Sequence, residues 1–145
     1  MENLLVSACL LGNLCKYNGG TNTLPAEQLE ALRRKYRLIP VCPETAGGLP
    51  VPREPSERQG NRVVSRAGKD VTEEYSRGAE DALILARRYG CRKALLKEKS
   101  PSCGCGEIYD GSFSRTLTPG DGVASELLKK NRIIIYGESR TEELL

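Results

Sequence analysis

The 145-residue chain contains no histidine, no tryptophan, one phenylalanine and one methionine. The absence of histidine removes the commonest general base and the commonest side-chain metal ligand at once. A Ser-His-Asp triad, a Cys-His protease and a His-ligated zinc enzyme are therefore excluded. Any chemistry carried by this chain must use cysteine, carboxylates, serine, lysine or a bound inorganic centre.

Long apolar runs are also missing, because no segment approaches the ~20 apolar residues that a membrane-spanning helix needs. Residues 1–11 are apolar, but Glu2 stands near their start and no basic residue precedes the run, so they do not predict a signal peptide. We expect a cytoplasmic protein with no membrane partner. Thiols stay reduced in that compartment, so the six cysteines are better interpreted as ligands or catalysts than as three disulfides.

The chain also lacks a large excess of charge of either sign, because 22 basic and 19 acidic residues leave a net charge of +3. This excess is small and interspersed, so it predicts no nucleic-acid groove, and we expect no stable nucleic-acid complex. It suits a small anionic molecule as partner. The length and composition are those of one globular domain, residues 1–145, and they leave the oligomeric state open.

Strand-like apolar runs alternate with amphipathic segments of helical period along the chain. The alternation predicts parallel βαβ units, and hence a single Rossmann-like α/β domain. Its mainly parallel sheet should be flanked by helices, with long functional loops at the carboxyl ends of the strands. The predicted strands are residues 4–6, 38–41, 62–65, 93–96 and 133–136, and the predicted helices are residues 25–36, 70–89 and 122–130.

Capping and loop signals refine this pattern. Asp70 is predicted as the N-cap of the long helix, with Glu73 completing a capping box, and Gly90 as the residue that ends it. Clustered prolines predict that residues 44–60 form no regular structure, and residues 97–121 are predicted as a second loop. Loops this long in a compact domain are often functional.

Three cysteines closely follow three predicted strands: Cys9, Cys42 and Cys103. In an open parallel sheet, sites form outside the carboxyl ends of the strands, so these cysteines should meet at one edge of the sheet. Each stands beside glycine, proline or serine rather than within an apolar run, which favours a site over simple packing. The weaker candidates are Cys15, Cys91 and Cys105, of which the first and last could act as auxiliary thiols.

Three thiolates without imidazole predict a centre that holds a soft metal. Zinc with three protein ligands and one water is one option, although catalytic zinc sites usually include histidine. An iron–sulfur cluster is the other, and three thiolates would leave one of its irons free of protein. The cysteine spacing does not decide between the two.

Polar residues accompany the candidate ligands. Glu44 follows Cys42 by two residues and could act as a general acid or base. Ser100 and Ser102 precede Cys103 and can donate hydrogen bonds to a substrate or to cluster sulfurs.

An anionic substrate needs donors of its own. Lys97, Ser102 and the backbone N–H groups of Gly19 and Gly20 are candidates for binding it, because glycine lets the backbone approach a phosphate closely. A glycine pair taken alone is a weak signal, since such pairs usually only form turns.

Three segments surround the candidate ligands: Ser7-Ala8-Cys9-Leu10-Leu11-Gly12, Cys42-Pro43-Glu44 with Gly47-Gly48-Leu49-Pro50, and Ser100-Pro101-Ser102-Cys103-Gly104. Taken together they resemble the thiouracil desulfidase family, and the resemblance covers nearly the whole chain. The resemblance implies a [4Fe-4S] cluster held by three cysteines, by motif Cys9, Cys42 and Cys103, with the fourth iron open to substrate sulfur. It also implies an assisting carboxylate and serine, which by motif fall on Glu44 and Ser100, with Ser102 next to the latter.

The working hypothesis is therefore non-redox desulfuration of a thiolated pyrimidine, either 2- or 4-thiouracil or 4-thiouridine monophosphate. Glu44 would activate a water, and Ser100 would position that water or relay a proton. One alternative is a non-catalytic cluster or zinc protein in redox sensing or sulfur transfer. Another is a metal-free thiol enzyme with Cys9 and Cys15 as nucleophile and resolving thiol. The substrate form and the choice between the two serines stay open.

Overall fold

A computed structural model describes all residues, 1–145, and its centre is a parallel sheet of four strands in the order β2-β1-β5-β8. These strands are β1 (Glu2–Ser7), β2 (Tyr36–Val41), β5 (Lys93–Leu96) and β8 (Ile134–Gly137). The helices are α1 (Ala26–Lys35), α2 (Pro43–Ala46), α3 (Thr72–Arg88) and α4 (Val123–Lys130), with 3-10 helices η1 (Ala8–Leu11) and η2 (Glu138–Leu144). The predicted α/β fold with a parallel sheet flanked by helices is confirmed.

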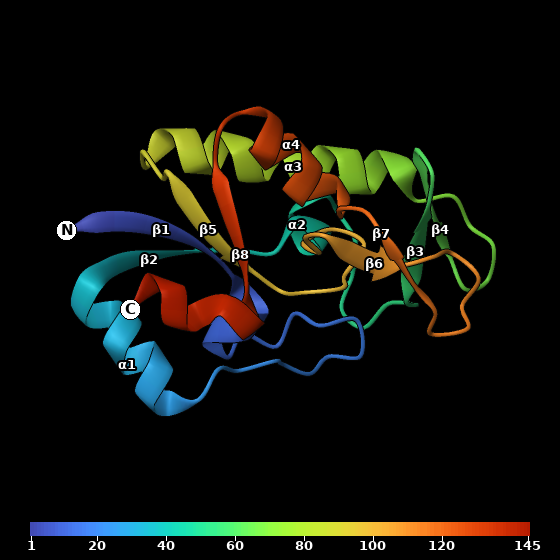
Figure 1. Ribbon diagram of the computed structural model, residues 1–145. Helices are drawn as coiled ribbons and strands as arrows, with labels where there is room; N and C mark the ends of the chain where they lie inside the picture. The colour runs from blue at the N-terminus through green and yellow to red at the C-terminus, as the bar shows by residue number, and fades with distance from the viewer.

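Helices cover both faces of this sheet (Figure 1). Leu4, Leu5 and Val6 of β1 are all apolar, and successive side chains of a strand point to opposite faces, so both faces of the sheet are apolar here. Leu5 packs in the core formed with α3 and α4, and its register partners Ile39 and Ala94 belong to the same core. Leu4 and Val6 pack on the other side, in the core that includes α1 and the end of η2.

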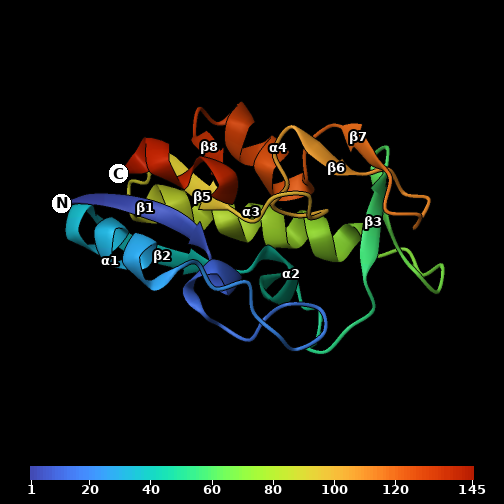
Figure 2. The same cartoon turned by 60° about the horizontal axis from the view of Figure 1, so that its bottom comes forward.

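Two antiparallel hairpins lie beyond the carboxyl ends of the central strands, on the side away from both termini (Figures 1 and 2). One joins β3 (Ser56–Gln59) to β4 (Arg62–Ser65), and the other joins β6 (Glu107–Tyr109) to β7 (Leu117–Pro119). α3 runs along one face of the sheet and on toward the first hairpin, where Tyr75 packs with Val63 and Val71. The hairpins therefore form walls around the strand ends.

The two predicted loops contain regular structure that the sequence analysis missed. Residues 44–60 include the end of α2, because Pro43 occupies a first-turn position where its missing N–H costs nothing. They also include β3, which begins directly after Pro55. Residues 97–121 contain the β6–β7 hairpin.

Two boundary predictions were also wrong. The first helix ends at Lys35, and Tyr36 is the first residue of β2. In that position the Tyr36 ring is buried and its hydroxyl donates a 2.9 Å hydrogen bond to the carbonyl of Leu144. Asp70 does not cap α3 with Glu73, since its carboxylate accepts hydrogen bonds from both the N–H and the hydroxyl of Thr72. The 3-10 helix at residues 138–144 had no sequence signal.

None of the helices has the combination of length and apolar character that would let it cross a bilayer.

Candidate functional site

The loops that follow β1, β2 and β5 open onto one cavity of ≈ 480 Å³. Side chains of α2, α3 and both hairpins complete its walls. Seven of the predicted site residues line it: Cys9, Cys42, Cys103, Glu44, Ser100, Ser102 and Lys97. Gly19 and Gly20 are not among its lining residues, so the structure does not place them with the others.

The three strand-end cysteines reach this cavity from separate segments. Cys9 lies in η1 directly after β1, Cys42 lies between β2 and α2, and Cys103 lies in the loop after β5. They converge because the carboxyl ends of parallel strands share one edge of the sheet. All six cysteines of the chain are free thiols.

Of the remaining cysteines, only Cys105 lies elsewhere than the sequence interpretation of Cys15 and Cys105 as auxiliary thiols suggested. Cys15 lines the cavity, and its carbonyl accepts a long 3.9 Å hydrogen bond from the thiol of Cys42. Cys91 is buried in the core beneath α3 and α4, and Cys105 packs against that core without lining the cavity. A fourth thiol therefore stands beside the predicted three.

Burial controls the protonation of these thiols. It raises the pKa of Cys9, and it raises the pKa of Cys103 to about 12. Burial, with the nearby Cys42, also raises the pKa of Cys15 to about 12. A metal centre that bound these sulfurs would displace their protons, because the thiolate is the ligand.

Hydrogen-bond donors lie next to the sulfurs of Cys9 and Cys103, where they would stabilise the deprotonated form. Asn22 contacts Cys9, and Ser7 and Ser102 contact Cys103, and each contact acts to lower the pKa of the thiol against the effect of burial. Donors of this kind around a sulfur are what a buried thiolate ligand requires.

The loop that carries Cys103 is held by the start of α4. Backbone N–H groups of Val123 and Ala124 donate to the carbonyls of Pro101 and Ser102, at 2.8 and 2.9 Å. Within the loop, the Ser100 hydroxyl accepts a 2.7 Å hydrogen bond from the N–H of Cys103. These hydrogen bonds satisfy backbone groups at both ends of the turn and hold the backbone that carries Cys103.

Two glycines let α2 touch α3 directly. A Cβ added to Gly78 would lie 1.8 Å from the carbonyl oxygen of Pro43, and one added to Gly47 would lie 1.9 Å from that of Glu74. Only glycine permits such an approach between two backbones. The contact places Glu44, which lies on α2, at the wall of the cavity.

The Glu44 carboxylate is bound on both oxygens. Oε1 accepts a 3.0 Å hydrogen bond from Arg53 Nε, and Oε2 accepts a 2.8 Å hydrogen bond from the hydroxyl of Ser102. Tyr75 is also adjacent: its burial, and next the negative charge of Glu44, raise the pKa of the Tyr75 hydroxyl. The carboxylate is therefore oriented toward the serines rather than toward solvent.

The two serines hold different positions in this network. Ser102 donates directly to Glu44, whereas Ser100 lies 3.2 Å from the Ser102 hydroxyl. Ser102 is 2% exposed, while Ser100 is only partly buried. The order along the network is Glu44, Ser102, Ser100.

The positively charged side chains that are available at the cavity are not the one that the sequence predicted, Lys97. Lys97 lines the cavity, but its Nζ forms a 2.8 Å ion pair with Glu138, so its charge is already compensated. Four other lining cations form no ion pair with a carboxylate, and they are Lys16, Arg66, Lys99 and Arg115. We call them the rim cations. In sequence they resemble ordinary surface charges, and no motif marks them.

The donor set can be compared with the two metal centres that the sequence left open. No three histidine, cysteine or acidic side chains are placed to hold a single metal ion. A mononuclear zinc needs all its ligands at about 2.0–2.3 Å from one point. A cluster of four irons spreads its thiolates around a larger body. Three thiols from separate walls of one cavity, without imidazole, fit the cluster better.

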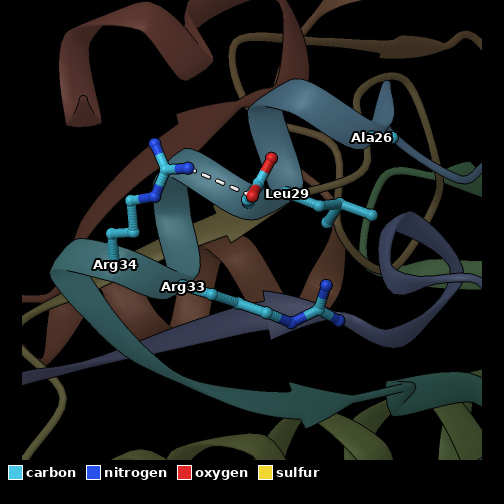
Figure 3. Close-up of a pocket in the computed structure, with 5 residues that line it drawn as sticks. Ala26, Leu29, Arg33 and Arg34 are labelled. Carbon is cyan, nitrogen blue, oxygen red and sulfur yellow. Dashed lines mark hydrogen bonds and ion pairs between the residues drawn. The ribbon is translucent and has the colours of Figure 1, made fainter.

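A second cavity, of ≈ 520 Å³, lies along α1 and is shown in Figure 3. All its lining residues come from that one helix, and they include the exposed Arg34–Glu30 ion pair of 3.1 Å. It contains no thiol and no buried polar group. The chemistry therefore belongs to the cysteine cavity.

The fold and this cavity define an α/β protein with a thiol-rich centre at the carboxyl edge of a parallel sheet. Residues 4–140 match the model of the 2-thiouracil desulfurase family, and the chain belongs to that family. The solved structure of the [4Fe-4S]-dependent thiouracil desulfidase TudS is 47% identical, with a TM-score of 0.95 over 99% of this chain and 95% of TudS. YbbK, an uncharacterized protein of Bacillus subtilis strain 168, is 37% identical over 152 residues, covering 98% of this chain and 99% of YbbK.

Proposed function

We propose that this chain is a [4Fe-4S]-dependent desulfidase, which replaces the sulfur of a thiolated pyrimidine by oxygen. Family membership and the likeness to TudS support this activity. The observation that carries the proposal is a combination within one cavity: three strand-end thiols beside a carboxylate that is hydrogen-bonded on both oxygens.

Cys9, Cys42 and Cys103 are the residues that would hold the cluster. Their donor set is all thiol, which suits iron–sulfur chemistry, and the contacts from Asn22 to Cys9 and from Ser7 to Cys103 would stabilise the sulfurs as thiolates. When bound, the cluster would supply a Lewis-acidic iron without a protein ligand, to which the thiocarbonyl sulfur could bind.

The reaction we propose consumes one water and no electrons. The water oxygen forms a bond to the pyrimidine carbon, the C–S bond breaks, and the sulfur leaves with the two water protons as hydrogen sulfide. Neither carbon nor sulfur changes its oxidation level. This is a hydrolytic, non-redox exchange of sulfur for oxygen.

The network around Glu44 supplies the proton transfers. Its carboxylate accepts a proton from the attacking water, as a general base with Arg53 holding its other oxygen. Ser102 and Ser100 connect the carboxylate to the open cavity through hydrogen bonds of 2.8 and 3.2 Å. We assign the partly exposed Ser100 to the water and the buried Ser102 to the relay.

The rim cations favour a substrate that carries a phosphate. Lys16, Arg66, Lys99 and Arg115 line the cavity without carboxylate partners, and an uncharged thiouracil would leave all of them without a partner. A nucleoside monophosphate places two negative charges where they can pair. We therefore propose 4-thiouridine monophosphate as a better substrate than free thiouracil, in a cytoplasmic protein.

The test is sulfide release by anaerobically reconstituted protein, with Glu44→Gln compared with wild type. Loss of the base should lower kcat by roughly 10²- to 10⁴-fold while iron and acid-labile sulfide contents stay at the wild-type level. Glu126→Gln, which changes a carboxylate outside the cavity, is the control and should keep its rate.

Three results would contradict the proposal in different ways. Wild-type kcat in Glu44→Gln would show that Glu44 is not the general base. A cluster-loaded wild type without turnover would favour a redox-sensing or sulfur-transfer protein. Turnover by metal-free protein would favour a thiol enzyme that uses Cys9 and Cys15.

A further inference from the structure

Arg53 is a buried arginine at the cavity, and all three nitrogens of its guanidinium donate hydrogen bonds. Its side chain is 7% exposed and donates to three acceptors on three segments. They are Glu44 Oε1 at 3.0 Å, the carbonyl of Cys15 at 2.9 Å and the carbonyl of Pro50 at 3.1 Å. The backbone N–H of Arg53 donates to the carbonyl of Tyr17 at 2.7 Å.

These contacts join parts of the cavity that no secondary structure connects. Glu44 lies on α2, whereas Cys15 and Tyr17 belong to the long irregular segment between η1 and α1. Cys15 is also the residue whose carbonyl the Cys42 thiol approaches. Arg53 is thus the common partner of the candidate base and of the segment that carries the fourth thiol.

We infer that Arg53 is the positioning residue of the desulfuration proposed above, on which this inference rests. It fixes the Glu44 carboxylate in the orientation that accepts from Ser102, and it holds the Cys15 segment against the cavity wall. Arg53 does not touch the reacting atoms in this scheme. It acts through Glu44.

The geometry requires arginine rather than lysine at this position. A guanidinium presents several N–H donors in one rigid plane, so it can bind three fixed acceptors simultaneously. A lysine ammonium on a flexible stem can hold the carboxylate or the Cys15 carbonyl, but not with the same fixed angles. Without the guanidinium, Glu44 keeps Ser102 and its neighbour Tyr75 and loses its partner on Oε1.

The experiment compares Arg53→Gln and Arg53→Lys with Arg58→Gln as matched control. Arg58 is a similarly buried arginine, 12% exposed, which also binds a carboxylate and two carbonyls, those of Glu126, Gly60 and Asp121. It does not line the cavity. Any general effect of removing a buried arginine should therefore appear in both proteins.

For the cluster-loaded enzyme, Arg53→Gln should lower kcat roughly 100-fold, because a misplacement of about 1 Å costs that much in a positioned reaction. KM for 2-thiouracil, which carries no phosphate, and the iron and sulfide contents should stay near wild type, Arg53→Lys should lose less, and Arg58→Gln should keep its kcat. In a Glu44→Gln background, Arg53→Gln should cause no further loss, since the two residues act as a unit.

A second measurement uses the cluster-free chain. Hydrogen exchange of the amides in residues 13–22 should be faster in Arg53→Gln than in wild type, and unchanged in Arg58→Gln. Unchanged kcat in Arg53→Gln, additive losses in the double variant, or unchanged exchange in residues 13–22 would each overturn the inference. An inactive but cluster-loaded wild type would instead overturn the proposed function.

Discussion

Ser102 donates a 2.8 Å hydrogen bond to Glu44, although 58 positions separate the two residues in the chain. Ser102 is held by the start of α4, and Glu44 is held by the contact of α2 with α3. Since α3 and α4 pack in the same core on one face of the sheet, this core sets the distance between a serine and a carboxylate. The hydrogen bond depends on the packing of helices that themselves contribute little to the cavity.

Ser102→Ala and Ser100→Ala should therefore have different effects. Ser102→Ala removes the donor to Glu44 Oε2, so kcat for sulfide release should fall by roughly 10²-fold, as for other positioned hydrogen-bond donors. Ser100→Ala also leaves the N–H of Cys103 without its acceptor, which costs about 1–3 kcal/mol of unfolding free energy. Thermal melting should thus separate the two variants. Wild-type kcat in Ser102→Ala would show that Ser100 acts without the relay.

Five of the six cysteines should sort into two classes by metal content. Cys9→Ser, Cys42→Ser and Cys103→Ser should each bind less iron and acid-labile sulfide after anaerobic reconstitution. Cys91→Ser and Cys105→Ser should bind wild-type amounts, because those thiols lie outside the cavity. Full cluster content in any of the first three variants would exclude that cysteine as a ligand.

Gly78→Ala tests the contact between α2 and α3. The added methyl would overlap the carbonyl of Pro43, and overpacking of this kind costs about 1–3 kcal/mol. Because α2 also carries Glu44, the melting temperature and kcat should fall together. Ser76→Ala changes an exposed position of the same helix and should leave both values unchanged. A normal kcat in Gly78→Ala would mean that Glu44 tolerates a shift of α2.

The rim cations should affect a nucleotide and not a free base. Arg66→Gln combined with Arg115→Gln should raise KM for 4-thiouridine monophosphate about tenfold, or ~1.4 kcal/mol, and leave KM for 2-thiouracil unchanged. Lys130→Gln changes an exposed cation outside the cavity and serves as control. Equal effects on both substrates would argue against a phosphate at the rim.

Asp70 should contribute to the pH dependence of stability. Hydrogen bonds from Thr72, and next the contact with Arg62, lower the pKa of Asp70 to about 2, compared with about 3.9 in an unfolded chain. A lowered pKa stabilises the fold above the unfolded value, and this contribution is lost as the pH falls toward the folded value. Between about pH 4 and pH 2, the free energy of unfolding of Asp70→Asn should fall less than that of wild type.

Urea unfolding at several pH values measures this difference. Asp81→Asn, an exposed position on α3, is the control and should follow the wild-type pH profile. Parallel profiles for Asp70→Asn and wild type would show that the carboxylate contributes equally in its charged and neutral forms.

The apolar pattern predicted the central sheet because its strands are short buried runs separated by amphipathic helices. The runs at residues 4–6, 38–41, 93–96 and 133–136 all fall on strands of the observed sheet, with ends shifted by at most two residues. The same reasoning failed at Tyr36 and Asp70, where a partner distant in the chain or a local hydroxyl replaced the expected helical contact. It predicted one strand of the first hairpin, residues 62–65, but missed β3, β6 and β7, which are too short and too polar to show a period.

For the site, sequence order alone was enough to gather Cys9, Cys42 and Cys103, because the position of a residue after a parallel strand determines the edge it reaches. The absence of histidine limited the chemistry to thiols and carboxylates. Only the tertiary structure decided that Arg53 binds Glu44, that Ser102 stands between Glu44 and Ser100, and that Lys97 is paired with Glu138. Those outcomes depend on distances between side chains of separate segments, which packing determines and which no local pattern records.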